Sequence, residues 1–235
     1  MEIVDINPEN FVYDYDIINN DKDHFDYYKK YYNLHTEFLR PLNIKININL
    51  FEKEIKQYHT KFRRWGDNRN HLPRYGISLV NYDGNIDGKY DIACGPLDQY
   101  NSGKHHTEHL WDDAFTKKTE VFYNLQSMRP LDCIKNFLVR STINLKHKHG
   151  NFVPHFDTMP KPNIQNLRLW GSNTSKGIEY KFLGNTVIDI EPGRLYLIDT
   201  TQWHYIISHK DWVYTFFIAL NNSQETFDWL KNNLI

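Results

Sequence analysis

The chain has 235 residues, of which 40% are hydrophobic and 15% aromatic, a composition that predicts a packed core and excludes a disordered chain. Its 28 Lys and Arg nearly balance its 29 Asp and Glu, so it lacks the basic surface of a dedicated nucleic-acid-binding protein. Two cysteines are too few for a disulfide scaffold or a zinc finger. No signal peptide and no apolar run of membrane-spanning length are found, so we expect a cytoplasmic protein that contacts neither nucleic acid nor a membrane.

Residues 1–137 are predicted to be a region of helices and loops with one strand. Helices are expected at residues 24–38, 50–63, 119–126 and 130–138, and a strand at residues 76–82. The turn signal Asp83-Gly84 ends that strand. Residues 84–118 are rich in Gly, Asn, His and Asp, so we expect a long loop with a short helix there.

From about residue 138 the chain changes to short strand-like runs separated by turn signals. These runs are residues 139–146, 151–155, 165–171, 177–182, 186–190, 194–199, 203–208 and 212–220. Closely spaced short strands are typical of a β-sandwich or barrel. We therefore predict one domain over residues 1–235, of the α+β class but mainly β, with an antiparallel β-core at 138–221 and a C-terminal helix within 222–235.

Three residues of the β-core have the chemistry of a metal site. His155 and Asp157 are two positions apart, and on an extended backbone such positions project from one face. His204 follows several strands later, where a rolled core can bring it beside the first pair. Two imidazoles and one carboxylate form the facial triad that binds Fe(II) and leaves open positions for other ligands. We therefore predict that His155, Asp157 and His204 are metal ligands and catalytic residues.

Several segments around these residues together carry a family resemblance. They are RSTINL (140–145), GNFVPH (150–155), NLRLW (166–170), GRLYLID (193–199), His204 and YTFFIAL (214–220). In their order and spacing, residues 138–220 resemble the Fe(II)/2-oxoglutarate-dependent oxygenases, specifically the aspartyl/asparaginyl β-hydroxylase and cis-proline hydroxylase branch. The resemblance implies a double-stranded β-helix (jelly-roll, cupin-like) core with N-terminal helices and a C-terminal helix. It also implies a dioxygenase that uses Fe(II), 2-oxoglutarate and O2 to hydroxylate a C–H bond.

The residues for 2-oxoglutarate are less complete in the sequence. The family usually has an Arg about ten residues after the distal His, whereas this chain has Tyr214 near that position. Arg168 lies in an apolar run, where a buried Arg needs an anionic partner: either the cosubstrate's far carboxylate or a structural ion pair. An outward-facing Arg168 is the third alternative. Asn144 falls near a family position that touches the cosubstrate, although a strand-edge role is equally open. Arg168, Asn144 and the Tyr214 hydroxyl are thus the predicted cosubstrate-binding groups.

Other features leave alternatives open. His105, His106 and His109 are expected to belong to a solvated loop or a substrate lid rather than to a metal site. The expected partner is a small-molecule or peptide substrate: an amino acid, a peptidyl residue or a small metabolite. Because the usual Arg is missing, a cupin-like metal enzyme that does not use 2-oxoglutarate remains an alternative, as does a nonenzymatic jelly-roll binding protein.

Overall fold

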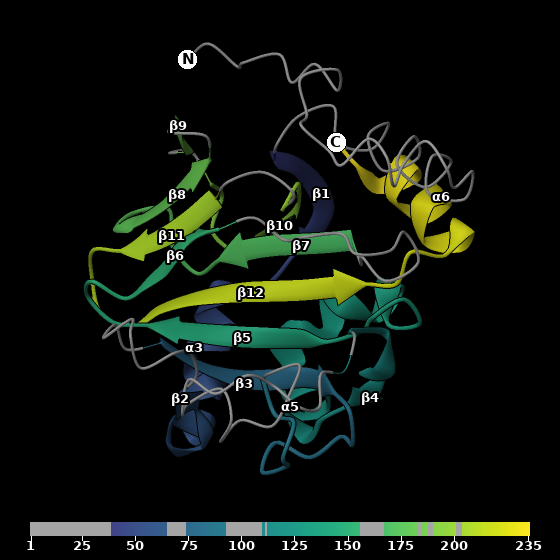
Figure 1. Ribbon diagram of the computed structural model, residues 1–235, viewed down its shortest axis with the longest axis horizontal. Coiled ribbons are helices and arrows are strands. Elements are labelled where there is room, and N and C mark those ends of the chain that lie inside the picture. The colour runs from purple at the N-terminus through teal and green to yellow at the C-terminus, as the bar shows by residue number, and fades with distance from the viewer. Residues whose placement is uncertain are drawn as a thin grey trace, which may run out of the picture.

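The protein is mainly antiparallel β-sheet with few helices in its computed structural model, which describes residues 39–64, 74–92, 110, 112–155, 167–182, 185–187, 190–200 and 204–235. The larger, eight-stranded sheet has the order β1 (Leu39–Lys45), β10 (Arg194–Ile198), β7 (Leu167–Ser172), β12 (Val213–Leu220), β5 (Ser141–Lys146), β3 (Arg74–Asn81) and β2 (Arg63–Arg64), with β4 (Lys117–Lys118) paired to β3. The smaller sheet has the order β6 (Asn151–His155), β11 (His204–Ser208), β8 (Ile178–Phe182) and β9 (Asn185–Val187). In Figure 1 the larger sheet crosses the molecule and the smaller sheet lies at one end of it.

Short helices accompany the larger sheet. They are α3 (Ile48–Glu54), the 3-10 helix η2 (Ile55–Lys61), η3 (Asp112–Ala114), α5 (Glu120–Asn124), the 3-10 helix η4 (Gln126–Ile134) and the C-terminal α6 (Gln224–Asn233). Asn47 and Ser223 cap α3 and α6, because their side chains accept hydrogen bonds from the backbone N–H groups of Leu50 and Thr226. None of the helices in the described part of the chain combines the length and the apolar character that a membrane span requires.

Two apolar clusters lie on opposite faces of the larger sheet. The main cluster joins sheet residues such as Ile143 and Phe216 to helix residues such as Phe51 and Leu131. The second cluster contains Trp170 and Ile198 of the larger sheet and Tyr180 and Ile206 of the smaller one. Every residue of β5 is buried, which is the pattern of a strand covered on both faces. The larger sheet therefore has helices on one side and the smaller sheet on the other.

Each strand predicted between residues 139 and 220 is confirmed, as are the helices at 50–63, 119–126 and the C-terminus, with shifted bounds. Residues 130–138 were predicted as a helix, but the structure has the 3-10 helix η4 at 126–134. Pro130 lies inside it and lacks the N–H that an α-helix would use. The predicted helix at residues 24–38 lies outside the described residues.

One strand was missed, and with it the extent of the sheet. The edge strand β1 pairs with β10, although no element is predicted at residues 39–45. Together with β2, β3 and β4 it belongs to the larger sheet. The larger sheet therefore extends beyond the predicted core of residues 138–221: residues before 138 contribute four of its eight strands.

Candidate functional site

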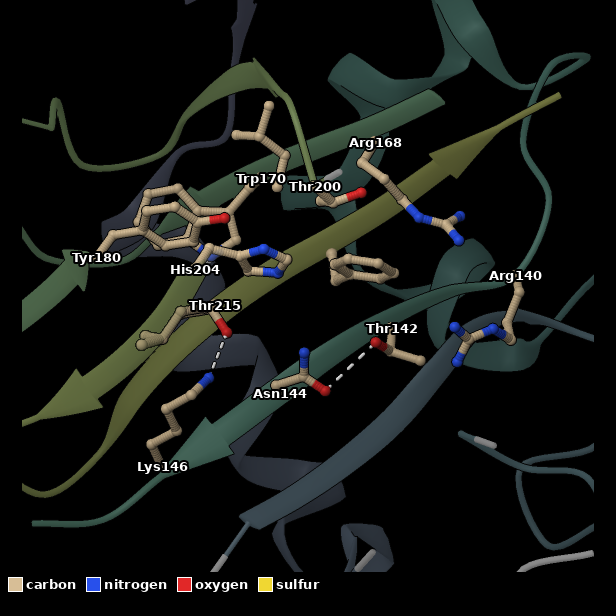
Figure 2. A pocket seen from close by; sticks show the side chains of 13 residues that line it. Arg140, Thr142, Asn144, Lys146, Arg168, Trp170, Tyr180, Thr200, His204 and Thr215 are labelled. Atoms are coloured by element: carbon tan, nitrogen blue, oxygen red, sulfur yellow. Dashed lines mark hydrogen bonds between the residues drawn. The ribbon is translucent and has the colours of Figure 1, made fainter. Parts of the chain in front are cut away.

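A cavity of about 110 Å³ lies between the two sheets (Figure 2). It is lined by Arg140, Thr142, Asn144, Lys146, Arg168, Trp170, Tyr180, Ile198, Thr200, His204, Ile206, Thr215 and Phe217. Most of these residues occupy alternate positions of their strands, since successive strand residues point to opposite faces. Residues from both sheets thus share one small-molecule-sized space, comparable with the roughly 150 Å³ cavity that can bind benzene.

The two predicted histidine ligands come together in the smaller sheet. His204 is the first residue of β11, and its register partner on the antiparallel strand β6 is His155. The His204 side chain is 6% exposed and lines the cavity. Its imidazole is stacked on the Tyr180 ring, with a centroid distance of 6.0 Å and an interplanar angle of 12°. The pairing brings two residues that are far apart in the sequence to adjacent strand positions.

The predicted third ligand, Asp157, lies outside the described residues. Within the part of the chain that the structure describes, no three His, Cys, Asp or Glu residues gather as a possible metal site. The predicted triad therefore remains a prediction, of which the structure shows the backbone pairing of two members. The histidines at 105, 106 and 109 also lie outside the described residues.

The inner face of β5 carries a row of polar side chains that ends in a lysine. Thr142, Asn144 and Lys146 all line the cavity, and the Thr142 hydroxyl donates to Asn144 Oδ1 at 3.3 Å. Lys146 is only 1% exposed, and its ammonium donates to Thr215 Oγ1 of β12 at 2.8 Å. Sequence reasoning missed Lys146 because the following His-Lys-His run suggests a solvated turn. The alternation with Thr142 and Asn144 is the signal that could have found it.

Arg168 has a protein partner, the buried Asp112 of η3. Its Nη1 lies 2.5 Å from Asp112 Oδ2, and Arg140 Nε donates to Asp112 Oδ1 at 2.6 Å. Burial alone raises the pKa of the Asp112 carboxyl, but the two guanidiniums outweigh it and hold that pKa well below its usual range. Of the three interpretations of Arg168, the structure thus shows the ion pair, and Arg168 also lines the cavity.

Tyr214 does not line the cavity, which corrects the prediction that its hydroxyl binds the cosubstrate. Tyr214 lies between Val213 and Thr215 on β12, and its ring belongs to the main apolar cluster on the opposite face of the sheet. Its hydroxyl is 2.8 Å from His59 Nε2, and its ring packs edge-on against Phe51 at 5.3 Å. The strand alternation that brings Thr215 into the cavity turns Tyr214 away from it. Asn144, in contrast, lies in the cavity wall as the prediction requires.

Several buried polar atoms in the cavity wall lack a hydrogen-bond partner among the described residues. They include Arg168 Nε, Trp170 Nε1 and Thr200 Oγ1. Buried donors are nearly always satisfied in folded proteins, so unsatisfied donors that face one cavity indicate that something polar binds there. The cavity thus has the character of a site for a polar ligand.

Comparison with known proteins gives little beyond this geometry. No protein-family model matches the chain, and no curated protein matches it. Among solved structures, the chain is similar to an oxidoreductase of the 2OG-Fe(II) oxygenase family from Burkholderia pseudomallei, at 12% sequence identity over 64% of this chain and 67% of that one, with a TM-score of 0.35. A similarity this distant establishes neither the fold nor the function of this chain.

Proposed function

We propose that the protein is an Fe(II)- and 2-oxoglutarate-dependent oxygenase that hydroxylates a C–H bond of an amino acid, a peptidyl residue or a small metabolite. The observation that carries the proposal is the pairing of His155 with His204 at the edge of a cavity whose wall holds a buried lysine. In the same proposal the two antiparallel sheets form a double-stranded β-helix of the aspartyl/asparaginyl β-hydroxylase and cis-proline hydroxylase type.

The donor set suits Fe(II). Directly opposite residues of an antiparallel pair lie close enough for their side chains to interact, and two imidazoles with one carboxylate are a preferred set for this ion. We assign the metal to His155, His204 and Asp157. The stacking of Tyr180 on the His204 imidazole restricts rotation of that ring and so orients its nitrogen.

The cation for 2-oxoglutarate is Lys146 rather than Arg168. Its ammonium is held by Thr215, which is opposite Asn144 in the pairing of β12 with β5. Lys146, Thr215 and Asn144 thus offer one charged and two polar groups to the far carboxylate of the cosubstrate. Arg168 is engaged by Asp112 instead. The missing Arg near Tyr214 is thereby replaced by a lysine from another strand.

The chain's own contribution is binding, orientation and exclusion of water. When bound, iron with 2-oxoglutarate and O2 supplies the oxidising chemistry, in which the cosubstrate is converted to succinate and CO2. Trp170, Ile198 and Ile206 form the apolar part of the cavity wall and limit the entry of water. Lys146 would bind the far carboxylate of the cosubstrate, and His204 would hold the metal.

The test compares His204→Ala with His209→Ala. His209 is an exposed histidine that follows the same strand and pairs with Glu179 outside the cavity. Calorimetry with Mn(II), a redox-inactive substitute for Fe(II), measures metal binding, and succinate formation over an amino-acid and peptide panel measures turnover. We expect His204→Ala to lose both and His209→Ala to keep both, with unchanged circular dichroism in each.

Other outcomes contradict the proposal in distinct ways. Full metal affinity in His204→Ala would remove this residue from the site. Oxygen consumption that does not require 2-oxoglutarate would favour a cupin-like metal enzyme. Metal binding without any succinate, whatever the substrate, would favour a nonenzymatic jelly-roll protein.

A further inference from the structure

Three turns, those after β5, β7 and β11, are joined at one end of the molecule. His149 N of the first turn donates to the Ser208 carbonyl at 2.8 Å. His209 N of the third turn donates to the Gly177 carbonyl of the second at 2.7 Å. Figure 1 shows the turns after β5 and β11 at the same end of the larger sheet. We call residues 147–150, 173–177 and 208–212 the three-turn surface.

The three-turn surface is locally basic. It contains three lysines, three histidines and one aspartate, which give a formal charge of +2 with neutral histidines, whereas the whole chain has −1. The lysines are Lys148, Lys176 and Lys210, all of them exposed. The Lys210 alkyl chain packs against Gly177, and its ammonium donates to Thr174 Oγ1 at 3.0 Å. The near-neutral charge of the whole chain led us to expect no contact with nucleic acid, but a total charge does not exclude a local basic surface.

Trp212 of this surface is both exposed and strained. It is 50% exposed, and its φ of +61° lies in the left-handed region, which is costly for a residue other than glycine. Asn173 holds this conformation, because its Nδ2 donates to the Trp212 carbonyl at 3.4 Å and its Oδ1 accepts from Tyr214 N at 2.9 Å. His149 also has a positive φ, of +67°. Backbone strain of this kind gathers at functional sites, so an exposed Trp held in it indicates a binding surface.

Two histidines hold the Trp212 ring as a platform. The His59 imidazole of η2 stacks on it with a centroid distance of 4.9 Å and an interplanar angle of 19°, and His147 packs edge-on at 5.0 Å. Burial and the nearby Lys56 ammonium lower the pKa of His59, which favours the neutral imidazole. His59 Nε2 is also 2.8 Å from the Tyr214 hydroxyl, so the platform is tied to the main apolar cluster. The exposed part of the indole is therefore presented in a fixed orientation.

We infer that the three-turn surface binds single-stranded nucleic acid, with a base stacked on Trp212 and the phosphates beside the lysines. An aromatic platform among cations is the general arrangement for binding single strands without sequence preference. Unpaired bases can stack on an aromatic side chain, whereas the bases of a duplex stack on one another. A membrane surface would need several exposed apolar side chains, and Trp212 is the only large one among the described residues of this surface. The inference does not rest on the proposed function, because none of these residues lines the cavity.

The experiment measures the fluorescence anisotropy of labelled oligo-dT and oligo-rU of about 12 nucleotides, titrated with the full chain. We expect the single strands to bind and a duplex of the same length to bind more weakly, because it offers no free base to the indole. Raising the salt from about 50 to 200 mM should weaken the single strands about tenfold, since three lysines displace counterions from the phosphates. The comparison of oligo-dT with oligo-rU shows whether the surface distinguishes DNA from RNA.

Variants then assign the binding to the platform. Trp212→Ala should weaken the single strands about ten- to hundredfold, with partial rescue by Trp212→Phe, which keeps a ring. Tyr123→Ala is the matched control, because Tyr123 is an exposed aromatic residue of α5 outside this surface. Circular dichroism and thermal unfolding check that each variant is folded.

The lysines are tested by a double variant, which removes two exposed charges and leaves the turns in place. Lys148→Gln with Lys176→Gln should weaken binding and reduce its dependence on salt, since fewer counterions are released. Lys135→Gln with Lys231→Gln is the matched control, because these lysines are exposed on other parts of the chain.

Three results overturn the inference. The first is no binding of either single strand, or equal binding by Trp212→Ala and the wild type. The second is a polyglutamate peptide or a duplex that binds as tightly as the single strands, which would mark a surface for acidic polypeptides or for polyanions in general. The third is binding to vesicles of anionic lipid without binding to the oligonucleotides. None of these measurements uses metal or 2-oxoglutarate, so a failure here leaves the proposed function unchanged.

Discussion

At the scale of single residues, the cavity is defined by a lysine that strand alternation turns inward. Lys146 ends β5, and its neighbour Leu145 points to the main apolar cluster. Its partner Thr215 is 69 positions away in the sequence. No reading of the local sequence could have found this contact, although the alternation of Thr142, Asn144 and Lys146 could have predicted a shared face.

Lys146→Met should weaken 2-oxoglutarate binding on the order of ten- to hundredfold, because a charge-assisted hydrogen bond is lost while most of the side-chain volume stays. Mn(II) affinity should change little. The measurement is a calorimetric titration of the Mn(II)-loaded variant, with the exposed Lys148→Met as the matched control. An unchanged affinity for 2-oxoglutarate in Lys146→Met would mean that another cation binds the cosubstrate.

Tyr214→Phe tests the corrected position of Tyr214. The variant loses the hydrogen bond to His59, so the free energy of unfolding should fall by about 0.5–1.5 kcal/mol. Affinity for 2-oxoglutarate should be unchanged, since Tyr214 does not line the cavity. Urea denaturation and calorimetry measure the two effects. A loss of cosubstrate affinity with no loss of stability would contradict this placement.

At the scale of elements, the glycine and proline turn signals were enough to predict the strands of residues 139–220, because each turn depends on a few neighbouring residues. The edge strand β1 was missed because its backbone pairing with β10 is a long-range contact and because Pro41 lowers its strand propensity. The turn before β10 shows how such distant segments meet. Gly193 has a φ of +82°, and its carbonyl accepts a hydrogen bond from Ile46 N at 2.8 Å.

Gly193→Ala should destabilise the protein more than Gly177→Ala. Both glycines have a positive φ, which costs a non-glycine residue about 1–2 kcal/mol. A Cβ at 193 would also lie 2.2 Å from the Ile46 carbonyl oxygen, whereas at 177 it would meet only the flexible Lys210 side chain, at 2.9 Å. Thermal and urea unfolding of the two variants provide the comparison. Equal losses of unfolding free energy in the two variants would mean that the backbone near Ile46 moves to accommodate the Cβ at no cost in stability.

At the scale of the whole molecule, the cavity depends on contacts between distant parts of the chain. Asp112 of η3 joins Arg140 and Arg168, and Arg140 Nη1 also donates to the Ile92 carbonyl at 3.3 Å. The sequence predicted that Arg168 needs an anionic partner, but it could not distinguish Asp112 from a ligand. The adjacency of His155 and His204 on neighbouring strands, in contrast, was expected from the run of short strands between them.

The neighbouring residue Asp91 makes the stability of the whole molecule depend on pH. Its carboxylate is fully buried, and burial raises its pKa to about 7 although Ser78 and Arg63 oppose the shift. An unfolded chain binds this proton only below about pH 4. Between these values the folded state holds more protons, so the free energy of unfolding should decrease as pH rises from about 4 to 7, by up to about 4 kcal/mol, and then level off.

Asp91→Asn should remove that decrease. Urea denaturation between pH 5 and 8 measures the difference in slope, with the exposed Asp87→Asn as the control that keeps the wild-type slope. A slope in Asp91→Asn equal to that of the wild type would show that Asp91 is ionised in the folded protein throughout this range.

The strand β12 has one further consequence, for how the protein tolerates mutation. Its even-numbered residues 214, 216, 218 and 220 belong to the main apolar cluster, whereas Thr215 and Phe217 line the cavity. The requirements of folding and of the cavity therefore act on alternate residues of one eight-residue strand. A library that varies only position 217 would change the cavity wall and leave both the main apolar cluster and the hydrogen bond between Lys146 and Thr215 in place.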